Sequence, residues 1–122
     1  MDNKKILIVE DEEEALGLVS NILARADYEV FSTTKGREAV VLAKEKQPHL
    51  IILDIILGDT DGGEIASTLS DDPETCGIPI IFLTGVIRKT EEQKDMRSGK
   101  HSVLAKPVTK DVLLKAVEQV FV

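Results

Sequence analysis

LIILD, at residues 50–54, decides the fold of this chain, because four consecutive apolar residues run directly into one aspartate. The run lacks polar alternation, which is typical of a strand covered on both faces of a parallel sheet. ILIV at residues 6–9 and IIFL at residues 80–83 are runs of the same kind. Weaker strand patterns lie at residues 28–32 and 103–105. The sequence therefore predicts five strands.

Segments with helical periodicity lie between these strands. The clearest is residues 15–26, where apolar residues recur at the spacing i, i+3, i+4, i+7. Shorter patterns of this kind lie at residues 39–43, 65–69 and 113–121, and Thr109 is the expected N-cap of the last helix. Residues 90–98 have helical propensity, but Met96 is their only clearly apolar residue. We expect this fourth helix to be the most loosely anchored of five.

Strands that alternate with helices predict an α/β fold, a doubly wound parallel sheet with helices on both faces. Five strands favour the flavodoxin-like order 2-1-3-4-5, an order taken by analogy with known folds rather than worked out from the residues. A length of 122 residues suits one domain. We expect residues 1–122 to form that domain, with no output domain attached.

Composition and charge disfavour several classes of function. The chain has 15 Lys and Arg residues against 22 Asp and Glu residues, and a net charge of −7 disfavours direct binding of nucleic acid. Cys76 is the only cysteine, so we expect a surface thiol and no internal disulfide. The short apolar run near the N-terminus suits neither a signal peptide nor a membrane span, which predicts a cytoplasmic location. His49 and His101 are isolated in the sequence, and we expect no catalytic role for either.

Polar residues follow the predicted strands at their carboxyl ends, where open α/β sheets bind ligands. Glu10 and Asp11 follow the first strand and Asp54 the third, while Thr84 and Lys106 follow the fourth and fifth. Each residue alone would suggest helix capping or the end of a strand, whereas the five together favour a functional site. Clustered carboxylates repel one another unless a cation lies among them, and ligands with oxygen atoms alone suit a hard ion. The site therefore predicts bound Mg²⁺, or Mn²⁺ in its place.

Four motifs carry these residues in a fixed order along the chain: ILIVEDEE (6–13), LIILDIILGDTDGGE (50–64), IPIIFLTG (78–85) and VLAKPV (103–108). Together they resemble the receiver domains of two-component response regulators, over essentially the whole chain. The resemblance implies a signalling switch, in which a sensor histidine kinase or a histidine phosphotransfer protein donates a phosphoryl group to Asp54. It further implies a downstream protein or a fused output domain that responds, and by analogy a phosphorylation-dependent homodimer. By the same resemblance we expect the domain to catalyse only its own phosphoryl transfer and slow dephosphorylation, and not to be an enzyme for a diffusible substrate.

The resemblance also assigns the metal ligands. Asp11, Asp54 and the main-chain carbonyl of Ile56 would hold the ion, with Glu10 beside it or reaching it through water. The positive charge of the ion would offset the charge of the phosphoryl group.

Contacts to the phosphoryl group follow from the same resemblance. Lys106 would supply a positive charge to one phosphoryl oxygen, and the Thr84 hydroxyl would bond another. Gly85 would leave room for that approach. The bond between Lys106 and Pro107 would be cis, as in the family.

The sequence departs from the family pattern at several positions. Val103 stands where many receivers carry an aromatic switch residue, so we expect output to depend mainly on residues 90–98. Gly58 replaces a common proline and should leave its turn freer. Ile56 and Val86 flank the path of an attacking water, and since neither can orient it, we expect slow self-dephosphorylation.

Two other interpretations stay open. One is a receiver that is not phosphorylated and serves as an interaction module, which Val103 and Gly58 mildly favour and the intact site residues disfavour. The other is a phosphohydrolase with Asp54 as nucleophile. That enzyme would need an acid/base carboxylate two residues later, and the residue there is Ile56.

Overall fold

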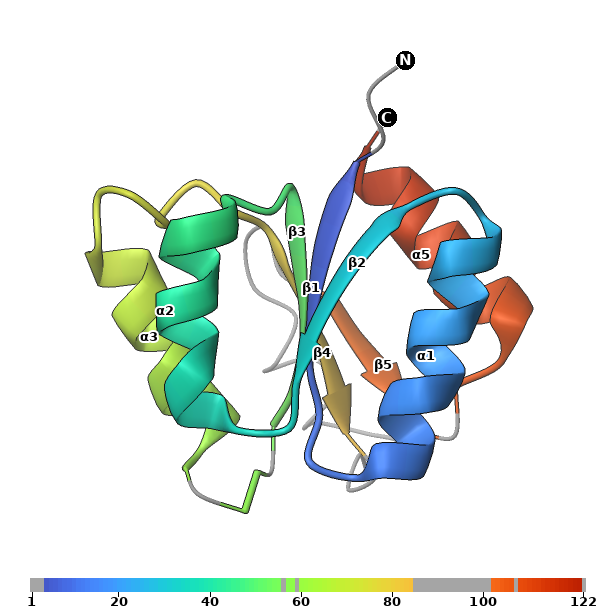
Figure 1. The fold of residues 1–122 in the computed structure, drawn as a ribbon, viewed down its shortest axis with the longest axis horizontal. Coiled ribbons are helices and arrows are strands. Elements are labelled where there is room, and N and C mark those ends of the chain that lie inside the picture. The colour runs from blue at the N-terminus through green and yellow to red at the C-terminus, as the bar shows by residue number, and fades with distance from the viewer. Residues whose placement is uncertain (1–3, 56, 59, 85–101, 107, 122) are drawn as a thin grey trace.

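A parallel five-stranded sheet forms the centre of the protein, between two layers of helices (Figure 1). The computed structural model describes residues 4–55, 57–58, 60–84, 102–106 and 108–121. The strands are β1 (Lys5–Val9), β2 (Glu29–Thr33), β3 (Leu50–Asp54), β4 (Ile80–Thr84) and β5 (Ser102–Ala105). They lie in the order β2-β1-β3-β4-β5, and every neighbouring pair is parallel. The predicted α/β class and strand order are confirmed.

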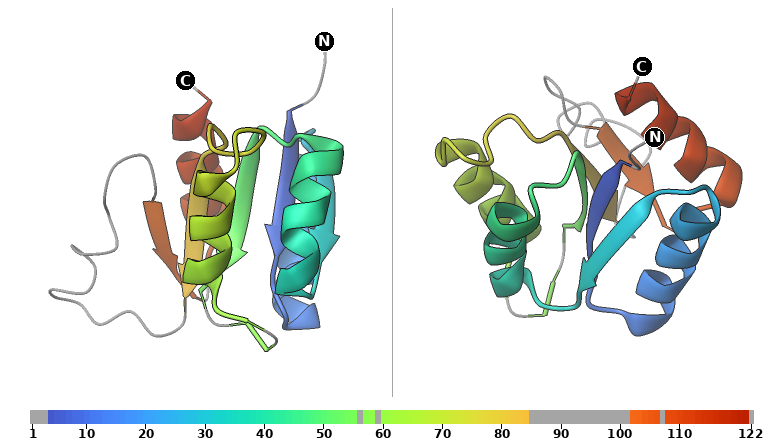
Figure 2. Two further views of the ribbon diagram at one scale, coloured as in Figure 1. Left: turned by 90° about the vertical axis from the view of Figure 1, so that its left-hand side faces the viewer. Right: turned by 45° about the horizontal axis from the view of Figure 1, so that its top comes forward.

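Helices cover both faces of the sheet. They are α1 (Glu13–Arg25), α2 (Gly36–Lys46), α3 (Gly62–Asp71) and α5 (Lys110–Val120). Figures 1 and 2 show α1 and α5 on one face, with α2 and α3 on the other. Thr109 caps α5 as predicted, because its Oγ1 accepts a hydrogen bond from the Val112 N–H at 3.3 Å. The helix expected at residues 90–98 lies outside the described residues.

β1, β3 and β4 send alternate side chains into two separate cores, because successive strand residues point to opposite faces. Between the sheet and the α1 and α5 layer, the buried core consists of Ile6, Ile8, Val19, Leu23, Leu50, Ile52, Ile81, Leu83, Val108, Leu113 and Val117. Between the sheet and the α2 and α3 layer, it consists of Leu7, Val9, Ala39, Ala43, Ile51, Leu53, Leu57, Ile65, Ala66, Leu69 and Ile80. Burial on both faces explains why these strands lack polar alternation in the sequence.

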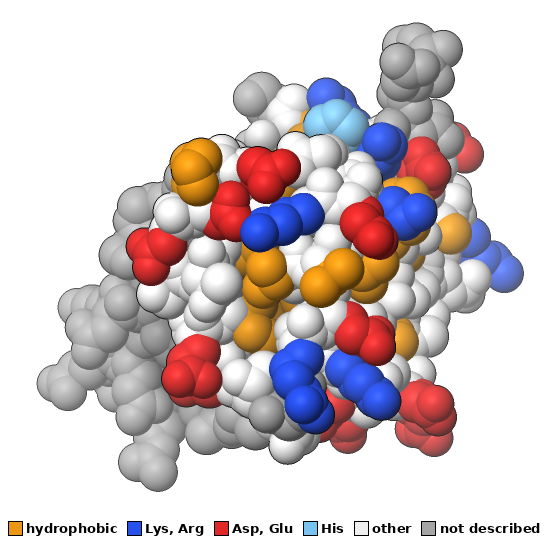
Figure 3. Space-filling view, turned by 60° about the vertical axis from the view of Figure 1, so that its left-hand side comes forward, with side chains coloured by type: hydrophobic (Ala, Val, Ile, Leu, Met, Phe, Trp, Pro, Cys, Tyr) orange, Lys and Arg blue, Asp and Glu red, His pale blue; other side chains and the backbone are white. Residues whose placement is uncertain are grey.

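Charged side chains, Cys76 and His49 lie at the surface of the described residues. Basic and acidic side chains are intermixed over the described part of the face formed by α2 and α3 (Figure 3). Cys76 is exposed, as predicted for a surface thiol. The His49 main-chain N–H donates to the Lys5 carbonyl at 2.8 Å, and its Nδ1 accepts the Lys5 N–H at 2.9 Å, so His49 links the starts of β1 and β3. His101 is not among the described residues. None of the helices in the described part of the chain is long and apolar enough to cross a membrane.

Candidate functional site at the carboxyl edge of the sheet

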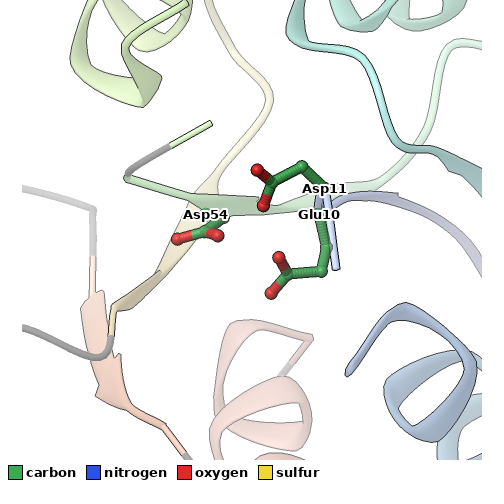
Figure 4. A group of neighbouring side chains, drawn as sticks. All are labelled: Glu10, Asp11 and Asp54. Atoms are coloured by element: carbon green, nitrogen blue, oxygen red, sulfur yellow. The ribbon is translucent and has the colours of Figure 1, made fainter. Parts of the chain in front are cut away.

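Three carboxylates meet at the carboxyl ends of β1 and β3. Asp54 is the last residue of β3, and Glu10 and Asp11 follow β1, its hydrogen-bonded neighbour. Figure 4 shows the three side chains around one space, and each offers an oxygen within 4.8 Å of the others. Glu10 is fully buried and Asp54 is 4% exposed, whereas Asp11 is exposed to solvent. The parallel arrangement therefore brings together acids that are more than 40 residues apart in sequence.

Lys106 brings a positive charge to these carboxylates. It follows β5, and because β4 lies between β3 and β5, its side chain extends past the end of β4. The Nζ lies 2.5 Å from Glu10 Oε1 and 3.0 Å from Asp54 Oδ2. A third and longer contact, of 3.4 Å, joins it to Glu12 Oε1. Because the Lys106 side chain is only 17% exposed, water screens its contacts with the two buried acids poorly.

Burial and charge shift the protonation of this group. Burial raises the pKa of Glu10 to about 7; the hydrogen bond from Lys106 opposes that rise, and the nearby Asp54 carboxylate adds to it. Burial lowers the pKa of Lys106, but its hydrogen bonds with Glu10 and Asp54 outweigh burial and leave that pKa above its ordinary value. Lys106 is therefore charged at neutral pH, while Glu10 titrates near neutrality.

The donor set fits a hard divalent ion. All three converging side chains offer carboxylate oxygens, which Mg²⁺ and Mn²⁺ prefer over nitrogen or sulfur ligands. Burial is the main cause of the raised pKa of Glu10, and the neighbouring Asp54 carboxylate adds to it, so a cation bound beside both acids would offset that repulsion. The carbonyl of Ile56, the fourth predicted ligand, lies outside the described residues.

The structure describes some of the other residues that the sequence predicted for the site. Thr84 ends β4, and its main chain pairs with Ala105, next to Lys106, at the same edge of the sheet. Val103 is buried in β5 at 6% exposure, and Gly58 is exposed near the Asp11 carboxylate. The remaining predicted positions, which lie outside the described residues, are Gly85, Val86 and Pro107.

Two residues that sequence reasoning missed contact this site. Glu12 forms an ion pair with Lys106, and its main-chain N–H donates to Glu10 Oε2 at 3.1 Å. Gly62 begins α3 with its N–H donating to the Ile55 carbonyl at 2.7 Å, and a Cβ there would collide with the Asp54 main-chain carbonyl. In the sequence, Glu12 lies in the acidic run EDEEE and Gly62 in the GG pair after Asp54. Neither pattern indicates by itself that the residue contacts the site.

Comparison with known proteins identifies the class of domain that this fold and site define. Residues 6–118 match the family model described as the response regulator receiver domain, so the chain belongs to that family. The polar-differentiation response regulator DivK of Brucella anthropi is 35% identical over 106 residues, which cover 87% of this chain and 86% of DivK.

Solved structures give the same result. The chemotaxis protein CheY4 of Vibrio cholerae superposes with a TM-score of 0.87 at 28% identity, over 98% of this chain and 99% of that protein. A putative response regulator from Chloroflexus aurantiacus superposes with a TM-score of 0.88 at 26% identity, over 98% of each chain. The chain is thus a receiver domain of the type found in two-component signalling.

Proposed function

We propose that this domain is a phosphorylation-dependent switch in a two-component phosphorelay, with Asp54 as phosphoacceptor. The observation that carries the proposal is the position of Asp54, at the end of a buried strand, 3.0 Å from Lys106 Nζ and beside two further carboxylates. The donor would be a phosphohistidine on a sensor kinase or a histidine phosphotransfer protein, as the family membership favours.

In the proposed reaction, a carboxylate oxygen of Asp54 attacks the phosphorus, and the bond from phosphorus to the donor histidine nitrogen breaks. Lys106 would move from the Asp54 carboxylate to an oxygen of the incoming phosphoryl group, where its charge offsets developing negative charge. The Thr84 hydroxyl would bond a second oxygen from the end of β4. Asp11, Asp54 and the Ile56 carbonyl would hold Mg²⁺ with Glu10 nearby; when bound, the ion supplies further positive charge.

The proposed output is a change of surface rather than turnover of a diffusible substrate. Val103, buried in β5, has no aromatic ring to turn inward, so another element must carry the signal to a downstream protein or output domain. Ile56 and Val86 offer no group to activate water, so the phosphorylated state should persist. We expect the protein to act in the cytoplasm.

The test is the intact mass of the protein after incubation with acetyl phosphate and Mg²⁺. We expect one phosphoryl adduct that is absent from Asp54→Asn and absent when a chelator removes the metal. An unmodified mass in the wild-type chain would instead favour the interaction module that is never phosphorylated. Sustained release of phosphate from a generic phosphate ester would favour the phosphohydrolase.

A further inference from the structure

Glu12 is the third acid that contacts Lys106, and its side chain is directed toward that lysine rather than toward the first turn of α1. It occupies the N-cap position of α1 but forms no side-chain cap hydrogen bond. Its Oε1 lies 3.4 Å from Lys106 Nζ, and its main-chain N–H is occupied by Glu10. The Glu12 side chain is 69% exposed, while the partner lysine is 17% exposed. Glu12 therefore places a carboxylate at the solvent side of the lysine that the phosphoryl group needs.

The Glu12 carboxylate is one negative charge more than a divalent ion and Lys106 would balance. When ionised, Glu10, Asp11 and Asp54 carry three negative charges, which one divalent ion together with Lys106 balances. The Glu12 charge is left over, 3.4 Å from the lysine that the proposed reaction needs. Glu12 and Lys106 also line a pocket of about 360 Å³, whose other walls are chiefly the apolar residues Ala15, Leu18, Val19, Leu83 and Val108. The apolar walls reduce the screening of the Glu12 charge on one side, while solvent screens it on the other, so we expect a modest effect on an anion near Lys106.

We infer that Glu12 is a specificity-determining residue, which disfavours phosphorylation of Asp54 by small anionic phosphodonors. It does so in two ways that rest on the proposed function: it repels the donor anion, and it competes with the phosphoryl oxygen for Lys106. A partner protein that docks on the domain supplies additional contacts and offsets this repulsion, whereas a small acyl phosphate has none. Glu12 thus biases the site toward protein donors.

Two small donors of different charge test the inference. With acetyl phosphate, a dianion, an Asp54 oxygen bonds to phosphorus, the bond from phosphorus to the acetyl oxygen breaks, and acetate leaves. With phosphoramidate, a monoanion whose nitrogen is already protonated, the bond from phosphorus to nitrogen breaks and ammonia leaves. Labelling rates are measured at saturating Mg²⁺ for the wild-type chain, Glu12→Gln and Glu13→Gln. Glu13→Gln is the matched control, because it removes the same charge one residue away and, among the described contacts, Glu13 has no ion pair with Lys106.

We expect Glu12→Gln to raise the rate with acetyl phosphate by about 3- to 10-fold and with phosphoramidate by a smaller factor, since the repulsion scales with donor charge. The gain should shrink toward about 1 M salt, where the screening length is about 3 Å. Equal rates for Glu12→Gln and Glu13→Gln would overturn the inference while leaving the phosphoacceptor role of Asp54 intact.

Mg²⁺ binding gives a readout that does not depend on phosphorylation. The dissociation constant should stay within about threefold of wild type in both variants, because a single exposed charge outside the ligand set changes affinity modestly. A much larger loss for Glu12→Gln would make Glu12 a metal ligand and overturn the inference. A wild-type chain that neither donor labels would overturn the proposed function, and this inference with it.

Discussion

Replacing Lys106 with methionine removes the positive charge that contacts two buried acids. Methionine keeps the length of the apolar stem, so the main loss is the ammonium group, 2.5 Å from Glu10 and 3.0 Å from Asp54. Removing one member of a buried ion pair costs about 3–5 kcal/mol, and since Lys106 retains some exposure we expect about 2–4 kcal/mol for the metal-free domain at about pH 8.

The loss should depend on pH through Glu10. Its pKa of about 7 lies above the usual 4.5, so the folded state holds this proton more tightly than the unfolded state. Without Lys106 the pKa of Glu10 rises further, because the hydrogen bond that lowers it is gone. At about pH 5.5 Glu10 is already protonated in the folded protein, so the loss of Lys106 removes no charge partner from it, whereas at about pH 8 the variant has to bury an ionised Glu10 or hold its proton at a cost. The destabilisation should therefore be smaller at about pH 5.5 than at about pH 8.

Urea unfolding at both pH values, in chelator and in Mg²⁺, measures this dependence. Mg²⁺ should restore part of the lost stability, because it replaces the missing positive charge among the carboxylates. Lys44→Met is the control: it breaks an exposed ion pair of 2.7 Å with Asp72, and we expect a much smaller effect with little response to Mg²⁺. Equal stability of Lys106→Met and wild type at about pH 8 in chelator would refute this account of the site.

The remaining predictions concern stability and use thermal or urea denaturation. Gly62→Ala should lower the free energy of unfolding by at least about 2 kcal/mol, because the new Cβ meets the rigid Asp54 carbonyl. Gly63→Ala is the control and should leave the free energy of unfolding unchanged, because its Cβ would lie at an ordinary contact distance of 3.4 Å from Asp61 Oδ1. Similar losses in both variants would contradict the contact between Gly62 and Asp54. Thr109→Ala should lower the free energy of unfolding by about 0.5–2 kcal/mol, because α5 loses its N-cap. Thr109→Ser keeps a capping hydroxyl and should retain most of the wild-type stability; equal losses in both variants would argue against the cap. In chelator, the free energy of unfolding should fall as pH rises from about 4.5 to about 7 because of Glu10, and Glu10→Gln should flatten that slope; an unchanged slope would assign it to other groups.

The sheet was predictable because its signal is local. LIIL before Asp54 has to be buried on both faces, and the structure buries all five residues of β3. The strand at 28–32 was harder to recognise, because β2 is an edge strand whose residues Glu29 and Ser32 are exposed. Residues 90–98 offered only propensity, which is a weak guide without apolar anchors.

The sequence predicts which residues form the site, but not which of them contact one another. Strand ends identify Glu10, Asp11, Asp54 and Lys106, since parallel strands align their carboxyl ends. Sequence does not show that Glu10 is fully buried, because burial depends on how residues distant along the chain pack over it. Nor does it reveal that Glu12 contacts a lysine 94 positions away, because EDEEE offers five acids with equal claims.

The central place of β3 has a consequence for the timescale on which the site moves. Its amides are hydrogen-bonded between β1 and β4, beneath helices on both faces, so exchange with solvent deuterium there should require nearly global unfolding. Asp54 is thus attached to the slowest-exchanging part of the protein, and its main chain offers little motion of its own. A response to a chemical change at its carboxylate therefore has to begin with the side chains that contact Asp54, such as Lys106, rather than with a displacement of β3 itself.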